Sequence, residues 1–173
     1  MLLVDLLIEK GAGVQDYLPD SIRASNESIA ETIENNVRRL ITEENPTNPI
    51  YYQRMSELLD ELILRRKQED LEYQNYLKEI VELSKKIKYP SNSQTYPKEI
   101  NTRGKQALYD NLGSDEVKAE TVHNAIMQAR SDDWRMYPLR ERAVKRAVYE
   151  SLSGISPQEL NDLFEIIKNQ NEY

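Results

Sequence analysis

Apolar residues recur every three or four positions along most of this chain, a spacing that places them on one face of an α-helix. The pattern predicts a first helix that stops at Gly11 and a second that ends near Glu44. At the start of the second helix, Ser28 and Glu31 have the spacing of a capping box, in which each side chain accepts from a backbone N–H. The apolar stripes are Leu2, Leu3, Leu6 and Leu7 in the first helix, and Ile29, Ile33, Val37, Leu40 and Ile41 in the second.

Two further stripes follow a rigid turn over 45–49, in which Asn48 can cap the next helix and Pro49 can take its first position. A charged span over 65–70 separates these two stripes. The spacing leaves two arrangements open, one long helical rod or an antiparallel pair of helices. The stripes are Tyr52, Met55, Leu59, Leu62 and Ile63, and then Tyr73, Tyr76, Leu77, Ile80, Leu83 and Ile87.

The helical spacing is interrupted over 90–101, where two prolines stand among polar residues. Such a stretch predicts a linker, here between an N-terminal helical subdomain over 1–89 and a C-terminal helical subdomain over 102–173. Helices of the second subdomain are expected near 102–112, near 115–130 after a capping Ser114, near 138–152, and from Ser156 onward, where Pro157 and Glu159 complete a capping box. The predicted fold class is all-α, a multi-helix bundle of about seven or eight helices.

Composition supports helices, because the chain has only 5 Gly and 1 Phe while 31% of its residues are charged. The net charge of −7 argues that the chain as a whole does not bind polyanions. Complete absence of Cys fits a cytoplasmic protein, and no apolar run reaches the roughly 18 residues that a membrane helix needs. The apolar helix at the very start favours a domain excised from a longer protein.

Residues able to carry chemistry are few and scattered. The glycines stand singly, so no phosphate-binding loop is expected, and His123 lacks a second ligand or triad partner at a fixed spacing. Glu57, Asp60 and Glu61 share a helix, but a solvated acidic face explains them better than a cation site. We therefore expect no catalytic residue, no bound cofactor and no metal ion in this chain.

The most distinctive segment is a basic island over 130–146, in which six cations outnumber three carboxylates. On the helix expected after Pro138, its cations lie one turn apart and can project together toward phosphate groups or a partner. The alternative is that these side chains form intramolecular pairs, and that Trp134 is a core residue or an interface anchor. The candidate contact residues for DNA or a partner are Arg130, Trp134, Arg135, Arg140, Arg142, Lys145 and Arg146.

Eleven tyrosines against one phenylalanine are a further bias. Tyrosine suits half-wet interfaces, because its ring packs while its hydroxyl reaches water. The bias favours an interaction surface over an enzyme.

Several stretches, taken in order, resemble the C-terminal helical region of the R (restriction, or motor) subunit of type I restriction-modification enzymes. Each stretch is an ordinary helix or turn sequence, so the resemblance lies in the ordered set, which covers nearly the whole chain. The stretches are AETIENNVRRLI over 30–41, NP at 48–49 with YY at 51–52, MSELL over 55–59, YL at 76–77 with IVEL over 80–83, INTRGKQALYDNL over 100–112, and WR at 134–135 ahead of RER over 140–142.

The resemblance implies a non-catalytic domain within a longer subunit. In that family, separate domains carry a nuclease and two motor modules that use ATP and Mg²⁺ to translocate DNA, which makes the parent an ATP-dependent site-specific deoxyribonuclease. The helical domain would contact the motor domains of its own chain, dock them onto the methyltransferase (M) and specificity (S) subunits, and offer a candidate contact to duplex DNA. A rival interpretation is a stand-alone helical adaptor or regulator with no role on DNA.

Overall fold

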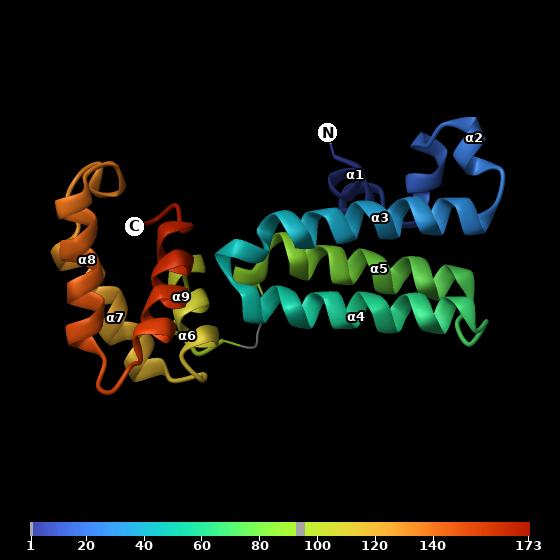
Figure 1. Cartoon of the computed structure of the whole chain (residues 1–173). Helices are drawn as coiled ribbons and strands as arrows, with labels where there is room; N and C mark the ends of the chain where they lie inside the picture. Colours follow the sequence, from blue (N-terminus) through green and yellow to red (C-terminus); the bar gives the residue numbers. More distant parts are fainter. Residues whose placement is uncertain (1, 93–95) are drawn as a thin grey trace. The chain divides into compact units, whose positions relative to one another are not determined.

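A computed structural model describes residues 2–92 and 96–173 of the chain, and it confirms the all-α fold class. The described residues contain nine α-helices and no strand, and eight of the helices have seven or more residues. Figure 1 shows the helices in chain order. They are α1 (Leu3–Lys10), α2 (Asp20–Arg23), α3 (Asn26–Glu44), α4 (Pro49–Lys67), α5 (Tyr73–Lys88), α6 (Arg103–Asn111), α7 (Glu116–Ala129), α8 (Pro138–Ser151) and α9 (Pro157–Lys168), with short 3₁₀ helices η1 (Gly11–Tyr17), η2 (Asn45–Thr47), η3 (Pro90–Asn92) and η4 (Trp134–Met136).

The chain divides into two compact units, and the second unit is discontinuous in sequence. Unit 1 consists of Met1–Asn45 and Tyr52–Asn92, and unit 2 consists of Pro46–Tyr51 and Ser93–Tyr173. The change after Asn92 falls within the predicted linker over 90–101, of which residues 93–95 lie outside the described residues. The predicted subdomain limits of 1–89 and 102–173 stay a prediction. The sequence pattern gave no sign that the turn before α4 belongs with the second unit.

The cap of helix α3 lies three residues earlier than predicted. The Ser25 hydroxyl accepts from the backbone N–H of Ser28 at 3.1 Å, so Ser25 is the capping residue and the predicted capping box at Ser28 and Glu31 is wrong. The apolar stripe is as expected, since Ile33, Val37 and Ile41 are buried.

Helices α4 and α5 form an antiparallel pair, which decides between the two arrangements that the sequence left open. The Tyr52 hydroxyl, near the start of α4, donates to the carbonyl oxygen of Ile87 at the end of α5 at 3.1 Å. At the opposite end, Arg65 Nη1 lies 2.7 Å from Glu79 Oε2. The turn between the helices includes Glu69 in the left-handed region, with φ of 58°. Figure 1 shows α3, α4 and α5 side by side along their lengths.

Helix α1 packs on α3 and α5 and ends at Gly11, as the pattern predicts. Gly11 has φ of 57°, a conformation that a residue with a Cβ rarely adopts. The buried residues are Val4 and Leu7, so the inward face is turned slightly from the predicted leucine stripe. The segments η1 and α2 were not predicted, because elements this short have no apolar period to reveal them.

A buried ion pair joins the three long helices of unit 1. Arg66 Nε lies 2.7 Å from Glu34 Oε1, and the two side chains are 8% and 7% exposed. A second guanidinium nitrogen contacts Glu27 at 2.7 Å, while the Tyr76 hydroxyl donates to Glu34 at 3.0 Å. Burial alone would lower the pKa of Arg66, but hydrogen bonds and charges from Glu34 and Glu27 outweigh it and raise the pKa. Burial, followed by the charge of Glu34, raises the pKa of Tyr76, so this phenol stays neutral.

Unit 2 has its own apolar core, to which α6, α7, α8 and α9 all contribute. Three caps fix its helix starts. Thr102 caps α6, Asp115 rather than the predicted Ser114 caps α7, and the predicted box of Ser156 and Glu159 opens α9. Ser114 instead takes a left-handed conformation with φ of 59° in the turn after Gly113. The core residues include Ile100, Leu108, Val122, Ile126, Trp134, Val144, Val148, Phe164 and Ile167.

Buried polar groups hold the segment 46–51 within unit 2. Asn48 Oδ1 accepts from the backbone N–H of Tyr51 at 3.3 Å, which confirms the predicted cap of α4. The Asn48 amide nitrogen donates to Asp110 at 2.8 Å, and both residues are about 5% exposed. Gln170 donates to the carbonyl oxygen of Thr47 at 2.6 Å. None of the helices in the described part of the chain has the length and apolar character needed to cross a bilayer.

Replacing Glu34 by Ala should lower the free energy of unfolding of unit 1 by about 3 kcal/mol, because it leaves the Arg66 guanidinium buried without its main partner. The double variant Glu34→Leu/Arg66→Met should recover most of this loss, since neither charge is then buried. Urea denaturation followed by circular dichroism measures the free energy of unfolding of both variants. The control is Arg39→Ala, which removes only an exposed pair with Glu43 and should change stability by less than about 0.5 kcal/mol. A Glu34→Ala variant as stable as this control would contradict the prediction.

Candidate interaction surface around the basic island

The basic island does not form one outward face, because three of the seven candidate residues point into unit 2. Trp134 is 2% exposed, and its ring centroid lies 5.9 Å from that of Phe164 in the core. Its indole N–H has no hydrogen-bond partner among the described residues. Arg130 and Arg135 are half-buried. Trp134 is therefore a core residue in this structure, and its indole is not available for stacking on a base.

Arg130 and Arg135 hold the segment 168–173 against unit 2. Arg135 donates to three main-chain oxygens, those of Lys168 at 3.0 Å, Gln170 at 2.6 Å and Tyr173 at 2.5 Å. Arg130 donates to the main-chain oxygen of Glu172 at 2.6 Å. Burial, and then the nearby charge of Arg130, lowers the pKa of Arg135. These carbonyls follow the end of α9, where cations are favourable because the helix dipole is negative.

The same segment is fixed from its other side by α6 and α7. Tyr173 is 4% exposed, and its hydroxyl lies 2.7 Å from His123 Nδ1. The Glu172 carboxylate accepts from the backbone N–H of Gly104, and a Cβ at position 104 would overlap that carboxylate. A larger residue at position 104 would therefore require the Glu172 and Tyr173 side chains to shift. Burial, followed by the charge of Lys105, lowers the pKa of His123, so the imidazole is neutral near pH 7.

The other four candidate residues lie on or near the surface of α8, and three of them have partners. Arg140 donates to the main-chain oxygen of Asp132 at 2.8 Å and lies 4.5 Å from the Tyr137 ring centroid. Lys145 donates to Asn161 at 2.5 Å, and Arg146 contacts Glu150 at 2.7 Å. Arg142 is exposed and has no acceptor among the described residues. Intramolecular contacts therefore occupy donors of three of these four cations, but only the Arg146–Glu150 contact pairs a positive with a negative charge.

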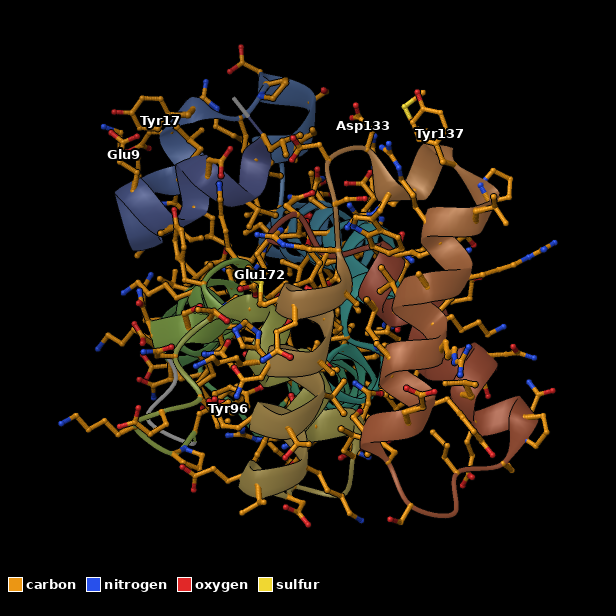
Figure 2. The ribbon with its side chains drawn as sticks, turned by 90° about the vertical axis from the view of Figure 1, so that its left-hand side faces the viewer. Glu9, Tyr17, Tyr96, Asp133, Tyr137 and Glu172 are labelled. Atoms are coloured by element: carbon orange, nitrogen blue, oxygen red, sulfur yellow. The ribbon has the colours of Figure 1, made fainter. Side chains whose placement is uncertain are left out.

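Three large apolar side chains stand exposed where the chain enters α8. Met136 and Leu139 are each 78% exposed and Tyr137 is 53% exposed. We call these three residues the α8-start surface. Figure 2 labels Tyr137 where the chain enters α8, with Asp133 on the loop before it. Exposed apolar side chains in one place mark interaction sites, and Met adapts easily to a partner because it is flexible and polarizable.

Sequence reasoning missed the α8-start surface, because it treats large apolar residues as buried. A signal was nevertheless present. Leu139 lies out of register with Val144 and Val148, the residues that α8 buries. An apolar residue that does not fit the inward stripe of its own helix is a candidate for a contact with another molecule.

Two of the three carboxylates considered as a cation site have hydrogen-bond partners. Asp60 accepts from Arg38 at 2.5 Å, and Glu57 accepts from Gln53 at 3.1 Å. No group of three or more potential metal ligands is found within residues 2–92 and 96–173. Comparison of the chain with protein-family models, with curated proteins and with solved structures gives no match.

Replacing Arg135 by Ala should lower the free energy of unfolding of unit 2 by about 3 kcal/mol, because three partly buried main-chain oxygens lose a charged donor. Amide hydrogen exchange over 168–173 should rise together with this loss. Arg142→Ala is the matched control, since it removes an exposed guanidinium from the same island and should change stability by less than about 0.5 kcal/mol. Unchanged amide hydrogen exchange over 168–173 in Arg135→Ala would contradict the proposal that Arg135 anchors this segment.

Unit 2 should lose stability as the pH falls from 7 to 5.5. The folded state depresses the pKa of His123 below the ordinary value of about 6.5, so the unfolded chain binds the proton more readily. The stability that the neutral His123 contributes is present above pH of about 6.5 and is lost as the pH falls toward the depressed pKa. Urea denaturation of the wild type and of His123→Gln at both pH values measures it. An equal loss in both proteins would assign the pH dependence to other groups.

Proposed function

We propose that this chain is a non-catalytic helical interaction domain, equivalent to the C-terminal domain of a type I restriction enzyme R subunit. In this role it docks the motor domains of its own longer chain onto the methyltransferase and specificity subunits. ATP, Mg²⁺ and DNA cleavage belong to other domains of the parent deoxyribonuclease. The ordered resemblance of its helices and turns supports the family, and the α8-start surface supports docking.

The observation that carries the docking role is the exposure of Met136, Tyr137 and Leu139 together. Interface cores are enriched in Tyr, Met and Arg and depleted in Lys and Glu, and the α8-start surface, with Arg140 stacked on Tyr137, has this composition. The surface is built on a rigid base, because Trp134 and Val144 anchor the same segment in the core of unit 2. A partner can therefore bind it without paying to order the loop.

Contact with duplex DNA is a narrower part of the proposal. Arg130, Trp134 and Arg135 are used internally, so the phosphate contacts fall to Arg140, Arg142, Lys145 and Arg146. Only Arg142 of these has no partner among the described residues, and the chain carries a net charge of −7. A site with so few free cations guides DNA that the motor domains hold, and does not capture DNA alone.

The rival function is a stand-alone adaptor with no role on DNA. The observation that favours it is the same internal pairing of the basic island, which leaves the apolar surface as the main feature for binding. Both functions predict a protein partner. They differ in whether that partner is the methyltransferase–specificity core, and this difference makes the test below decisive.

The immobilised chain should capture the purified methyltransferase–specificity core of its cognate enzyme, and Met136→Asp/Leu139→Asp should weaken this capture more than about tenfold. Both substitutions are at exposed positions, so the fold should be retained. Val117→Asp is the matched control, because Val117 is 75% exposed on α7 of the same unit and should leave capture unchanged.

Failure of the unchanged chain to capture the core would contradict the docking role and favour the adaptor. An equal loss in Val117→Asp would show that capture does not use the α8-start surface. Adding duplex DNA to the captured complex tests the narrower proposal. Arg142→Glu should then reduce the DNA retained without reducing the core retained.

A further inference from the structure

The outward face of α8 carries a stripe that differs from the rest of the surface. At 100° per residue, Leu139, Ala143 and Glu150 fall on one side of the helix together with Arg142, Arg146 and Tyr149. Leu139 and Tyr149 are 78% and 54% exposed, and the other four residues are also exposed. The opposite side is formed by Val144 and Val148, which are fully buried. We call the six exposed residues the α8 stripe.

We propose that the α8 stripe binds an acidic amphipathic helix of a partner protein. This inference deepens the proposed docking function by naming the chemistry of the partner element, and it rests on that function for the identity of the partner protein. The stripe spans about three helical turns, roughly 17 Å, which is the length of a short helix-on-helix contact.

Shape and apolarity favour a helix as the occupant. Ala143 lies one turn after Leu139 on the same side of α8, so a small side chain adjoins the large apolar one. A small residue on a helix surface allows another backbone to come close. A partner helix with apolar residues at helical spacing can cover Leu139 and Tyr149 together, whereas a phosphate backbone offers nothing apolar to cover them.

Charge favours an acidic partner. Arg142 and Arg146 project from the stripe against a single carboxylate, that of Glu150, and Arg142 has no acceptor among the described residues. Asp or Glu residues on a partner helix would pair with both arginines.

The same charges argue against a second copy of this chain as the occupant. A two-fold pairing of stripes would bring two arginines from each copy against one glutamate from each copy. The excess of positive charge would lie at the centre of that contact. An acidic partner helix removes the excess, and a second copy doubles it.

The test uses the full chain, labelled with ¹⁵N, and two synthetic helical peptides of about 18 residues, a length that supports a marginal helix. Both peptides carry leucines on one face, and one has glutamates on its flanks where the other has lysines. The glutamate peptide should shift amide signals over 139–150 and should bind roughly tenfold tighter than the lysine peptide, the factor expected from two exposed Arg–carboxylate pairs.

Arg142→Glu/Arg146→Glu should reverse this preference, so that the lysine peptide binds more tightly. Such a reversal also shows that the variant is folded. Arg39→Glu/Lys98→Glu is the matched control, because it changes the net charge equally at exposed positions outside α8 in the sequence and should keep the original preference.

Equal binding of the two peptides, absence of binding by both, or shifts outside 139–150 would overturn the proposal. Displacement of the glutamate peptide by duplex DNA would assign the stripe to DNA, and self-association abolished by the charge reversal would assign it to a second copy. Because no methyltransferase or specificity subunit enters this experiment, its result is independent of the capture test. If neither peptide binds but the chain still captures the methyltransferase–specificity core, only the inference of an acidic partner helix is lost.

Discussion

Burial of charged guanidinium groups is the interaction on which both units depend. A chain with 39% hydrophobic residues has limited apolar surface to bury, and each unit adds a half-buried or buried arginine where apolar packing ends. In unit 1, Arg66 crosses from α4 to Glu34 on α3 beside Tyr76 of α5. In unit 2, Arg135 gathers three main-chain oxygens of the segment after α9. These interactions give orientation as well as stability, because a guanidinium donates its hydrogen bonds only in fixed directions.

These internal contacts of arginine also determine which side chains of 130–146 remain available to bind a partner. Arg130 and Arg135 donate to the chain's own main-chain oxygens and position them, so the segment 130–146 has fewer cations with free donors than its composition suggests. What is left outside is apolar at Met136, Tyr137 and Leu139 and basic mainly at Arg142. Such a mixture recognises another protein more readily than it recognises DNA, because DNA binding relies on many phosphate contacts.

Helical periodicity was enough to predict the class of the fold and most helices. The stripes of α3, α4 and α5 and the start of α9 follow from local spacing, which needs no knowledge of the partner helix. The capping residues of α3 and α7 were predicted wrongly, because Ser25 and Ser28, like Ser114 and Asp115, are equally able to cap by composition. The roles of Arg130 and Arg135 could not be predicted, since their acceptors are main-chain oxygens 42 and 35 positions away and no side-chain pattern marks a carbonyl. A signal for Glu34 did exist, because it interrupts the apolar face of α3 one turn after Ala30.

Membership of the segment 46–51 in unit 2 has a consequence for the order of events during synthesis. Thr47 leaves the ribosome before the residue whose side chain donates to its carbonyl oxygen, because that residue is Gln170, 123 positions later. The hydrogen bond from Asn48 likewise cannot form until Asp110 has been synthesised. Unit 1 can therefore reach most of its contacts while translation continues, whereas unit 2 reaches its complete set only when nearly all of these 173 residues have been made. Until then, the turn that starts α4 is exposed to chaperones and proteases.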